Sequence, residues 1–227
     1  DISCETPMLR LLQGDVGSGK TIVAALIASS IVADNKQVAI LAPTTILANQ
    51  HYQNFVQWFG CDDEIELLTS KIAVKEKRQI YQKIQSGKTK IIIGTHAVFQ
   101  KDVVYKNLSL VIYDEQHRFG VSQRLKLKEK SENFPHQLLL SATPIPRTMA
   151  MGVLSGLDVS TIKSLPPNRK PIVTSTLPNK RRGALISRIK SAISEGAQVY
   201  WVCPLIDESE TELIGIEDLE KILSKEF

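Results

Sequence analysis

The amino-acid sequence predicts an α/β fold in which helices flank a mostly parallel β-sheet. Short apolar runs alternate with segments of helical character along the chain, which is typical of strands joined by crossover helices. The runs are apolar at nearly every position, as expected of strands covered on both faces. Polar or turn residues follow several of the runs, and ligands gather at those carboxyl ends in parallel sheets.

We expect six strands, each of them short and rich in Val, Ile and Leu. They comprise residues 8–12, 38–42, 65–68, 91–93, 108–113 and 138–140. Pro144 and Pro146 lie just beyond the last strand. They end it, because proline offers no N–H to the hydrogen bonding of a sheet.

Two helices are expected between the second and fourth strands, over residues 46–59 and 74–85. The first carries a leucine and three aromatic residues at roughly helical spacing, namely Leu47, Phe55, Trp58 and Phe59. This spacing favours a stripe that faces the core, with a platform for stacked bases as the alternative. The second is an amphipathic surface helix, and Gly87 ends it.

The strongest motif lies between the first strand and a helix that begins at Thr21. Residues 14–21 match the pattern G-x-x-x-x-G-K-[ST] of a phosphate-binding loop. Glycines allow backbone N–H groups to turn inward on an anion at the N-terminus of the helix. We expect Lys20 to reach the β- and γ-phosphates and the Thr21 hydroxyl to bind Mg²⁺. The predicted nucleotide-binding residues are Gly14, Asp15, Val16, Gly17, Ser18, Gly19, Lys20 and Thr21.

A second motif, Asp114-Glu115-Gln116-His117, directly follows the fifth strand. Asp114 is expected to bind Mg²⁺, and Glu115 to orient and polarise the attacking water. A water-activating carboxylate distinguishes a hydrolase from a protein that only binds nucleotide. Two adjacent acids at a strand end also occur by chance, and their position after a phosphate-binding loop favours the catalytic interpretation.

The composition excludes several classes of protein. Apolar residues make up 43% and charged residues 23% of the 227 positions, which favours a soluble globular protein over a disordered or fibrous one. No apolar run is long enough to span a membrane and the first residues do not resemble a signal peptide, so we expect a cytoplasmic protein. Cys4, Cys61 and Cys203 are far apart, which favours reduced thiols over a disulfide framework. A net charge of +4 is compatible with a polyanion partner without requiring one.

The amino-acid composition changes after residue 165. Residues 166–171 are polar and rich in proline, which is typical of a linker between domains. Beyond them we expect an extended segment over 172–177, a helix over 180–194, a strand over 199–202 and a charged terminal helix. These elements offer too little apolar surface for a second independent core.

Five stretches of this chain resemble the motor of the RecG-type ATP-dependent DNA helicases. These enzymes translocate on duplex DNA and remodel branched structures such as stalled forks and Holliday junctions. The stretches are residues 11–21, 94–100, 114–121, 141–148 and 200–206. The resemblance implies a first RecA-like ATP-binding lobe over residues 1–165, a linker over 166–178 and the start of a second RecA-like lobe over 179–227.

The resemblance also implies ATP and Mg²⁺ as cofactors and branched or duplex DNA as the partner, with no membrane and a monomeric full-length protein. Residues that follow the second and fourth strands would face the DNA backbone, namely Pro43, Thr44, Thr95 and His96. Gln116 and His117, with Ser141 and Thr143, would couple the nucleotide state to movement between the lobes. The residues alone leave open that Ser141 and Thr143 only tie backbone groups in a loop.

The chain departs from the family pattern at both ends. It begins just before the phosphate-binding loop, without the wedge domain and the glutamine motif that contacts adenine, and it stops at Phe227. On the resemblance, we expect most of the second lobe, with its arginine-bearing motif, to be missing from this chain. We expect a fragment of the motor that is nearly inactive in isolation.

Two other functions fit some of these motifs. A transcription-repair coupling translocase shares the loop, the H-R-F-G-V run and the T-P-I-P-R-T run, whereas Gln116 and the Gln123-Arg124 pair favour RecG. A nucleotide-gated binding module without turnover is the second alternative, and Glu115 argues against it. Leu154-Ser155-Gly156 only superficially resembles the signature of transporter ATPases.

Overall fold

The computed structural model describes residues 1–4, 6–60, 63–70, 72–115, 134–143, 156–164, 172–202 and 224. The chain divides into two compact units, Asp1–Arg169 and Lys170–Phe227. In the part of the chain that the structure describes, no helix combines the length and the apolar character needed to cross a membrane.

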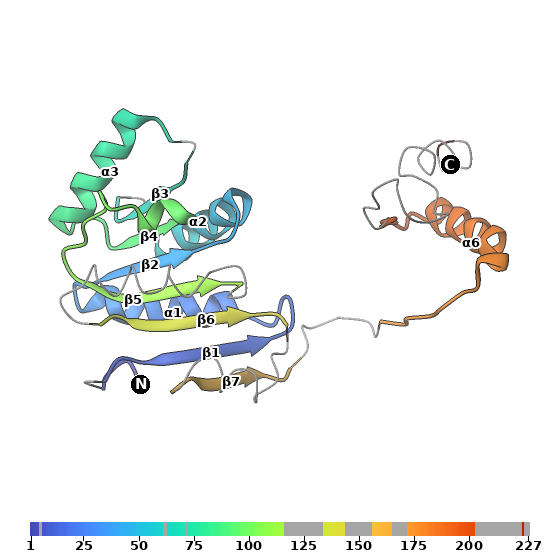
Figure 1. Cartoon of the computed structure of the whole chain (residues 1–227), viewed down its shortest axis with the longest axis horizontal. Coiled ribbons are helices and arrows are strands. Elements are labelled where there is room, and N and C mark those ends of the chain that lie inside the picture. The colour runs from blue at the N-terminus through green and yellow to red at the C-terminus, as the bar shows by residue number, and fades with distance from the viewer. Residues whose placement is uncertain are drawn as a thin grey trace, which may run out of the picture. The chain divides into compact units, whose positions relative to one another are not determined.

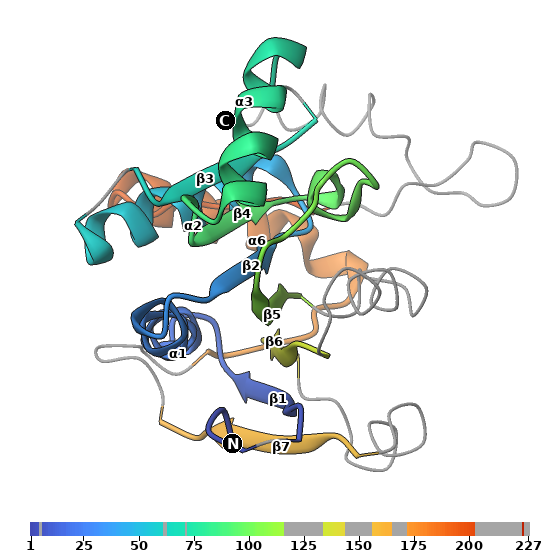
Figure 2. The same cartoon turned by 90° about the vertical axis from the view of Figure 1, so that its left-hand side faces the viewer.

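The first unit is built on a seven-stranded sheet in the order β3-β4-β2-β5-β6-β1-β7, and every paired strand is parallel to its neighbour. Figure 2, which looks along the strands, shows this order from β3 to β7. The strands are β1 Leu9–Gly14, β2 Gln37–Leu41, β3 Ile65–Leu68, β4 Ile91–Gly94, β5 Leu108–Asp114, β6 His136–Ser141 and β7 Asp158–Ile162. The predicted α/β fold with a mostly parallel sheet is confirmed. Strand β3 has the expected bounds, and the ends of the other five expected strands shift by at most two residues.

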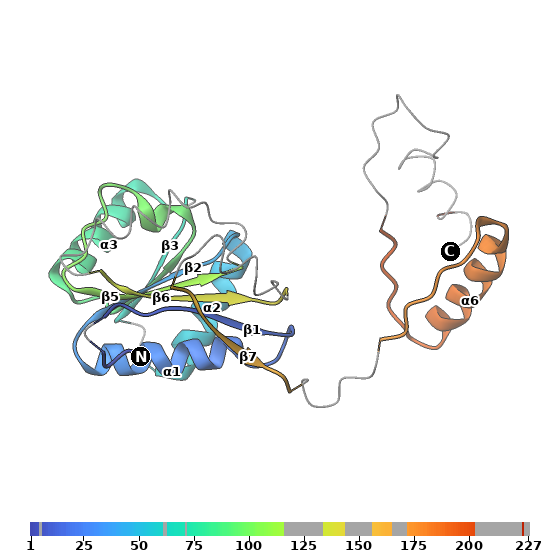
Figure 3. The same ribbon diagram turned by 60° about the horizontal axis from the view of Figure 1, so that its bottom comes forward.

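The two faces of the sheet carry separate apolar cores. Helices α1 (Lys20–Ala33) and α2 (Thr45–Phe59) cover one face, and α3 (Val74–Ser86) with the short helix η1 (His96–Phe99) covers the other (Figures 1 and 3). Successive residues of one strand point to opposite faces. Leu11 thus belongs to the core beneath α3, and Leu12 to the core beneath α1.

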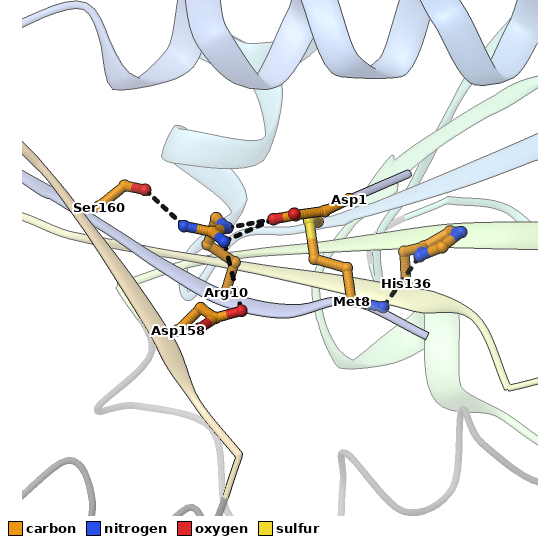
Figure 4. Close-up of polar contacts among 6 residues, drawn as sticks. All are labelled: Asp1, Met8, Arg10, His136, Asp158 and Ser160. Atoms are coloured by element: carbon orange, nitrogen blue, oxygen red, sulfur yellow. Dashed lines mark hydrogen bonds and ion pairs between the residues drawn. The ribbon is translucent and has the colours of Figure 1, made fainter. Parts of the chain in front are cut away.

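Strand β7 at the edge of the sheet was not predicted from the sequence. Its residues include Asp158 and Ser160 and are only partly buried, so the continuous apolar pattern that marks the inner strands is missing. Arg10 of β1 joins it to the sheet, because its guanidinium donates to Asp158 Oδ2 at 3.2 Å and to Ser160 Oγ at 2.8 Å (Figure 4). A third bond of the same guanidinium, 2.6 Å long, reaches Asp1 Oδ2.

The predicted apolar stripe on α2 is partly correct. Phe55 is 1% exposed, and its ring lies 5.7 Å from that of Phe59 in a stacked arrangement. Trp58 is instead 43% exposed, since it projects from the margin of the buried face. Helix α3 ends as expected, with Gly87 in the left-handed region at φ 76°.

Gln37, the first residue of β2, is a buried polar clamp at the amino ends of the strands. Its amide nitrogen donates to the carbonyls of Ile84 at 2.9 Å and Thr89 at 2.8 Å. Its amide oxygen accepts from the backbone nitrogens of Lys106 at 2.8 Å and Asn107 at 3.0 Å. The side chain is 1% exposed, and all four of its hydrogen-bonding positions are satisfied.

The second unit contains a short helix η3 (Asn179–Arg181) that leads into α6 (Arg182–Ser194). The prediction of a strand over residues 199–202 is wrong, because these residues have no regular secondary structure. A strand needs a partner for its backbone groups, and the described residues of this unit include no other strand. Tyr200 and Val202 are 88% and 86% exposed. Residues 166–171 of the expected linker lie outside the described residues. The expected terminal helix also lies outside them, apart from residue 224.

Candidate nucleotide-binding site

Three neighbouring strands end at one edge of the sheet and define the candidate site. In the sheet register Gln13 of β1 lies opposite Ser141 of β6, and Leu140 of β6 lies opposite Asp114 of β5. The loop after β1, the loop after β6 and the acidic residues at the end of β5 therefore begin side by side. This is the carboxyl edge, where parallel sheets bind ligands.

The loop between β1 and α1 depends on glycines, because two of its residues have backbone conformations that other residue types rarely adopt. Gly17 and Gly19 have φ angles of 78° and 95°, in the left-handed region. The backbone N–H of Ser18 donates to Asp15 O at 3.1 Å and closes the turn. Because α1 begins directly after Gly19, the free N–H groups of its first turn lie at the loop.

The base of the loop has no room for a side chain at Gly14. A Cβ there would lie 2.4 Å from Ser18 Oγ and 3.2 Å from Ile162 Cβ. The Ser18 hydroxyl itself is buried and has no hydrogen-bond partner among the described residues. A buried hydroxyl without a partner is uncommon in folded proteins, so the loop is suited to a further polar group such as a phosphate.

Lys20 brings positive charge to this loop. Its ammonium donates to the carbonyls of Gly14 at 2.7 Å and Asp15 at 2.8 Å. The ammonium adds to the positive end of the α1 dipole, and both favour an anion at the same place. Thr21 lies in the first turn of α1, with its side chain half-buried. Val16 is 69% exposed at the outer side of the loop.

Asp114, the last residue of β5, bonds to a histidine that was not predicted from the sequence. His51 Nε2 of α2 lies 2.8 Å from Asp114 Oδ2, and the two side chains are 9% and 16% exposed. The residues are 63 positions apart in the chain. A single histidine in a helix gives no local signal, so only the packing of α2 against the sheet reveals this pair.

Glu115 follows with its backbone in the left-handed region at φ 55°. This conformation costs a residue with a Cβ roughly 1 to 2 kcal/mol, and such strained residues cluster at functional sites. The chain therefore turns sharply after Asp114. Gln116 and His117, which were expected to couple the two lobes, lie outside the described residues.

Ser141 and Thr143 tie together the loop after β6. The Ser141 hydroxyl donates to Thr143 O at 3.0 Å and accepts from the backbone N–H of Thr143 at 3.2 Å. The two hydroxyls are also 3.0 Å apart. These contacts tie backbone groups within the loop, which is the structural alternative that the sequence left open for the two residues. Strand β6, from which the loop leads, lies between β1 and β5 in the sheet.

The residues expected to face DNA lie farther along the same edge. Thr44 caps α2, because its hydroxyl accepts from the Leu47 N–H at 3.3 Å, and Pro43 precedes it. Thr95 and His96 follow β4, which pairs with β2. The structure therefore brings these four residues to adjacent strand ends. His96 is exposed.

The chain approaches itself closely at the end of β4. A Cβ on Gly94 would lie 2.0 Å from the backbone oxygen of Leu68 in β3, so no other residue fits there. The Thr95 N–H donates to the same oxygen at 3.3 Å. Glycine at this position therefore fixes the course of the chain into Thr95 and His96.

The described residues contain no group of three or more His, Cys, Asp or Glu side chains that could hold a metal ion. Magnesium does not require such a group when it is bound by one carboxylate, a hydroxyl, water and phosphate oxygens. The residues at this edge thus fit a magnesium nucleotide better than a metal held by protein alone.

Comparisons with known proteins show which family the chain resembles. The family model described as DEAD/DEAH box helicase matches residues 7–151. The chain is 50% identical over 234 residues to the ATP-dependent DNA helicase RecG of Pasteurella multocida (strain Pm70). This aligned stretch covers 98% of this chain and 34% of that protein. It is 51% identical over 215 residues to RecG of Escherichia coli (strain K12), which covers 92% of this chain and 31% of that protein. The chain spans about a third of the length of these curated relatives.

A solved structure of RecG bound to a three-way DNA junction is also similar. The match covers 100% of this chain and 29% of the other, with 39% identity and a TM-score of 0.79. The likeness thus extends over both units of the chain.

Proposed function

The chain belongs to the DEAD/DEAH box helicase family, and from this premise we propose that it is the ATP-binding part of a RecG-type ATP-dependent DNA helicase. About half of its residues are identical to those of RecG proteins over nearly the whole chain. Because the chain spans only about a third of those proteins, the action of the whole protein on forks and Holliday junctions is part of this proposal.

The observation that carries the proposal is the meeting of three strand ends at one edge. The loop after β1 offers glycine-dependent N–H groups and the Lys20 ammonium, which suit the β- and γ-phosphates of ATP. Asp114 lies at the end of β5, two strands away. Neighbouring strands are about 4.8 Å apart, so a magnesium nucleotide bound at the loop can reach its carboxylate.

Each residue at this edge has a role in the proposal. Lys20 holds the terminal phosphates, the Thr21 hydroxyl and Asp114 hold magnesium, and Glu115 orients and polarises the attacking water. Magnesium, when bound, neutralises charge on the β- and γ-phosphates. Ser141 and Thr143, with Gln116 and His117, couple the nucleotide state to movement of the lobes.

DNA is the proposed macromolecular partner. Pro43, Thr44, Thr95 and His96 contact its backbone, and the position of these residues along the same edge as the nucleotide supports this assignment. Hydroxyl and backbone N–H groups are common ligands of phosphate oxygens and carry no sequence preference. The full-length protein is proposed to act as a monomer in the cytoplasm.

The domain division is proposed as follows. Residues 1–165 form a first RecA-like lobe, residues 166–178 a linker, and residues 179–227 the start of a second RecA-like lobe. The second lobe would supply the arginine that stabilises charge on the transferred phosphoryl group.

A chimaera tests the proposal directly. The matching third of E. coli RecG is replaced by this chain, and ATP-dependent unwinding of a synthetic three-way junction is measured. We expect unwinding by the chimaera and none by the same chimaera with Lys20→Ala. A folded, ATP-hydrolysing chimaera that translocates on linear duplex DNA but leaves junctions intact would favour the transcription-repair coupling alternative.

A further inference from the structure

The buried pair of His51 and Asp114 gives the nucleotide site a supporting residue. We propose that His51 is a positioning residue, which donates a hydrogen bond from Nε2 to Asp114 Oδ2 and thereby orients the carboxylate toward magnesium. The inference rests on the proposed function, because it assumes that Asp114 binds the metal of a magnesium nucleotide. His51 itself does not touch the nucleotide in this scheme.

The direction of the hydrogen bond follows from the chemistry of the two groups. An ionised carboxylate only accepts hydrogen bonds, so the 2.8 Å contact requires the proton on His51 Nε2. The other ring nitrogen, Nδ1, is buried and has no hydrogen-bond partner among the described residues. An N–H at that position would be buried without an acceptor, which is costly. The buried environment of the ring therefore favours Nε2 as the nitrogen that donates to Asp114.

The His51 ring is held in place by the core. Helix α2 buries three residues, Ala48, His51 and Phe55, whose spacing of three and four positions places them on one face of the helix. His51 is in the middle of this set and is 7% exposed. A swing of its ring away from Asp114 would therefore displace packed side chains.

The contact with His51 Nε2 restricts the rotation of the Asp114 carboxylate. The terminal torsion of aspartate is broad, without sharp rotamer wells. Magnesium, in contrast, demands nearly ideal octahedral geometry. A bond that occupies Oδ2 fixes the plane of the carboxylate and leaves Oδ1 available to the metal. Partners of this kind hold metal-binding carboxylates in other proteins, and their loss typically costs 10-fold to 100-fold in metal affinity.

Two substitutions separate positioning from packing. In His51→Gln the amide nitrogen is as many bonds from the backbone as Nε2 of histidine, so this variant keeps a donor for Asp114. In His51→Asn the amide lies at the level of Nδ1 and is too short to reach. Both variants replace the ring by a smaller polar group, so a role in packing alone predicts similar losses for the two.

The experiment measures metal binding and not turnover. The chain is mixed with a fluorescent ATP analogue, and magnesium is titrated to find the concentration that gives half of the metal-dependent signal. We expect His51→Asn to raise this concentration by about 10-fold to 100-fold, and His51→Gln to stay close to the wild type. Binding of the analogue without magnesium should be the same in all three proteins. An unchanged magnesium requirement in His51→Asn, or equal losses in both variants, would overturn the inference.

The wild-type protein offers a second test that needs no substitution. Long-range nitrogen–proton NMR spectra distinguish histidine rings that carry the proton on Nε2 from rings that carry it on Nδ1. We expect the Nε2 form for His51, and the Nδ1 form would overturn the inference. If the wild type binds the analogue but shows no response to magnesium, Asp114 is not a metal ligand and the inference fails with that assignment. If it binds no analogue, the proposed nucleotide site itself is wrong.

Discussion

The backbone N–H of Met8 donates a 3.0 Å hydrogen bond to Nδ1 of His136 (Figure 4). The bond joins the segment that enters β1 to the first residue of β6, at the end of the sheet opposite the candidate nucleotide-binding site. His136 can accept this bond only while Nδ1 carries no proton. Burial lowers the pKa of His136 below its ordinary value of 6.5, and the positive charges of Lys36 and the terminal amine lower it further.

This pair predicts a loss of stability in mild acid. Because the pKa of His136 is lower in the folded state, the unfolded chain binds more protons in the interval between the two pKa values. The contribution is therefore fully present above pH 6.5 and declines as the pH falls toward the lowered pKa. Denaturant unfolding over this range measures it. The control His136→Asn keeps an acceptor that does not titrate, and an equally steep loss in that variant would contradict the prediction.

Lys20→Ala should weaken ATP binding strongly. The substitution removes an ammonium from a loop where it lies against Gly14 and Asp15, and a hydrogen bond to a charged group contributes roughly 1.5 to 3 kcal/mol. We expect a loss of at least about 10-fold in affinity for a fluorescent ATP analogue. Lys75→Ala, at an exposed lysine of α3, is the matched control and should bind normally. Equal affinity in the two variants would mean that the loop binds no phosphate.

Glu115→Gln should retain binding of the magnesium nucleotide and lose hydrolysis. The amide preserves the size of the side chain but cannot act as a base toward water. Asp114 and Thr21 remain available to the metal in this variant. Phosphate release is measured with DNA in the full-length protein, and nucleotide affinity is measured in parallel. Turnover at the wild-type rate would refute the role assigned to this carboxylate.

Gln37→Leu should destabilise the first unit without altering the residues of the candidate nucleotide-binding site. The substitution leaves the N–H groups of Lys106 and Asn107 without their acceptor, and the carbonyls of Ile84 and Thr89 without their donor. Buried polar groups left without partners cost about 1 to 3 kcal/mol each, so we expect the free energy of unfolding to fall by several kcal/mol. Gln53→Leu on the exposed side of α2 is the control. If the free energy of unfolding changed only slightly in both variants, water would be replacing the four hydrogen bonds of the Gln37 side chain, and the prediction would be wrong.

The chain in isolation should bind magnesium ATP but hydrolyse it very slowly. An arginine finger accelerates phosphoryl transfer by about 10³ to 10⁵ in related enzymes, and in our proposal a second lobe supplies this arginine. Phosphate release from the purified chain is compared with release from Lys20→Ala prepared in the same way. Robust turnover that increases with DNA and disappears in Lys20→Ala would show that hydrolysis needs no arginine from a second lobe.

The sequence predicted those features of the fold that are encoded locally. The inner strands were recognised because burial on both faces makes them apolar throughout, and the loop over residues 14–21 because its backbone conformation needs glycines at fixed positions. Strand β7 was missed because an edge strand is only half-covered and can carry Asp158 and Ser160. Residues 199–202 carry the apolar pattern of a strand, but the described residues of their unit offer no partner strand.

The candidate site was predicted where one motif contains all the residues, and missed where two distant elements meet. Lys20 and Asp114 each lie within a recognisable motif, at the start of α1 and at the end of β5. His51 depends on the packing of α2 beside the end of β5, and 63 positions separate it from its partner. No spacing rule connects two such residues, since their contact exists only after the sheet has assembled.

Two residues other than glycine have positive φ angles in the described part of the first unit, Asn35 at 62° and Glu115 at 55°. Asparagine adopts this conformation readily, whereas glutamate resists it. Natural variation at residue 115 is therefore under two opposed pressures. Selection for folding alone would replace the glutamate by glycine or asparagine, whereas the proposed role of Glu115 in hydrolysis would retain the carboxylate. Relatives that have lost ATP turnover should consequently have drifted toward Gly or Asn at this position, while active ones keep the strained acid.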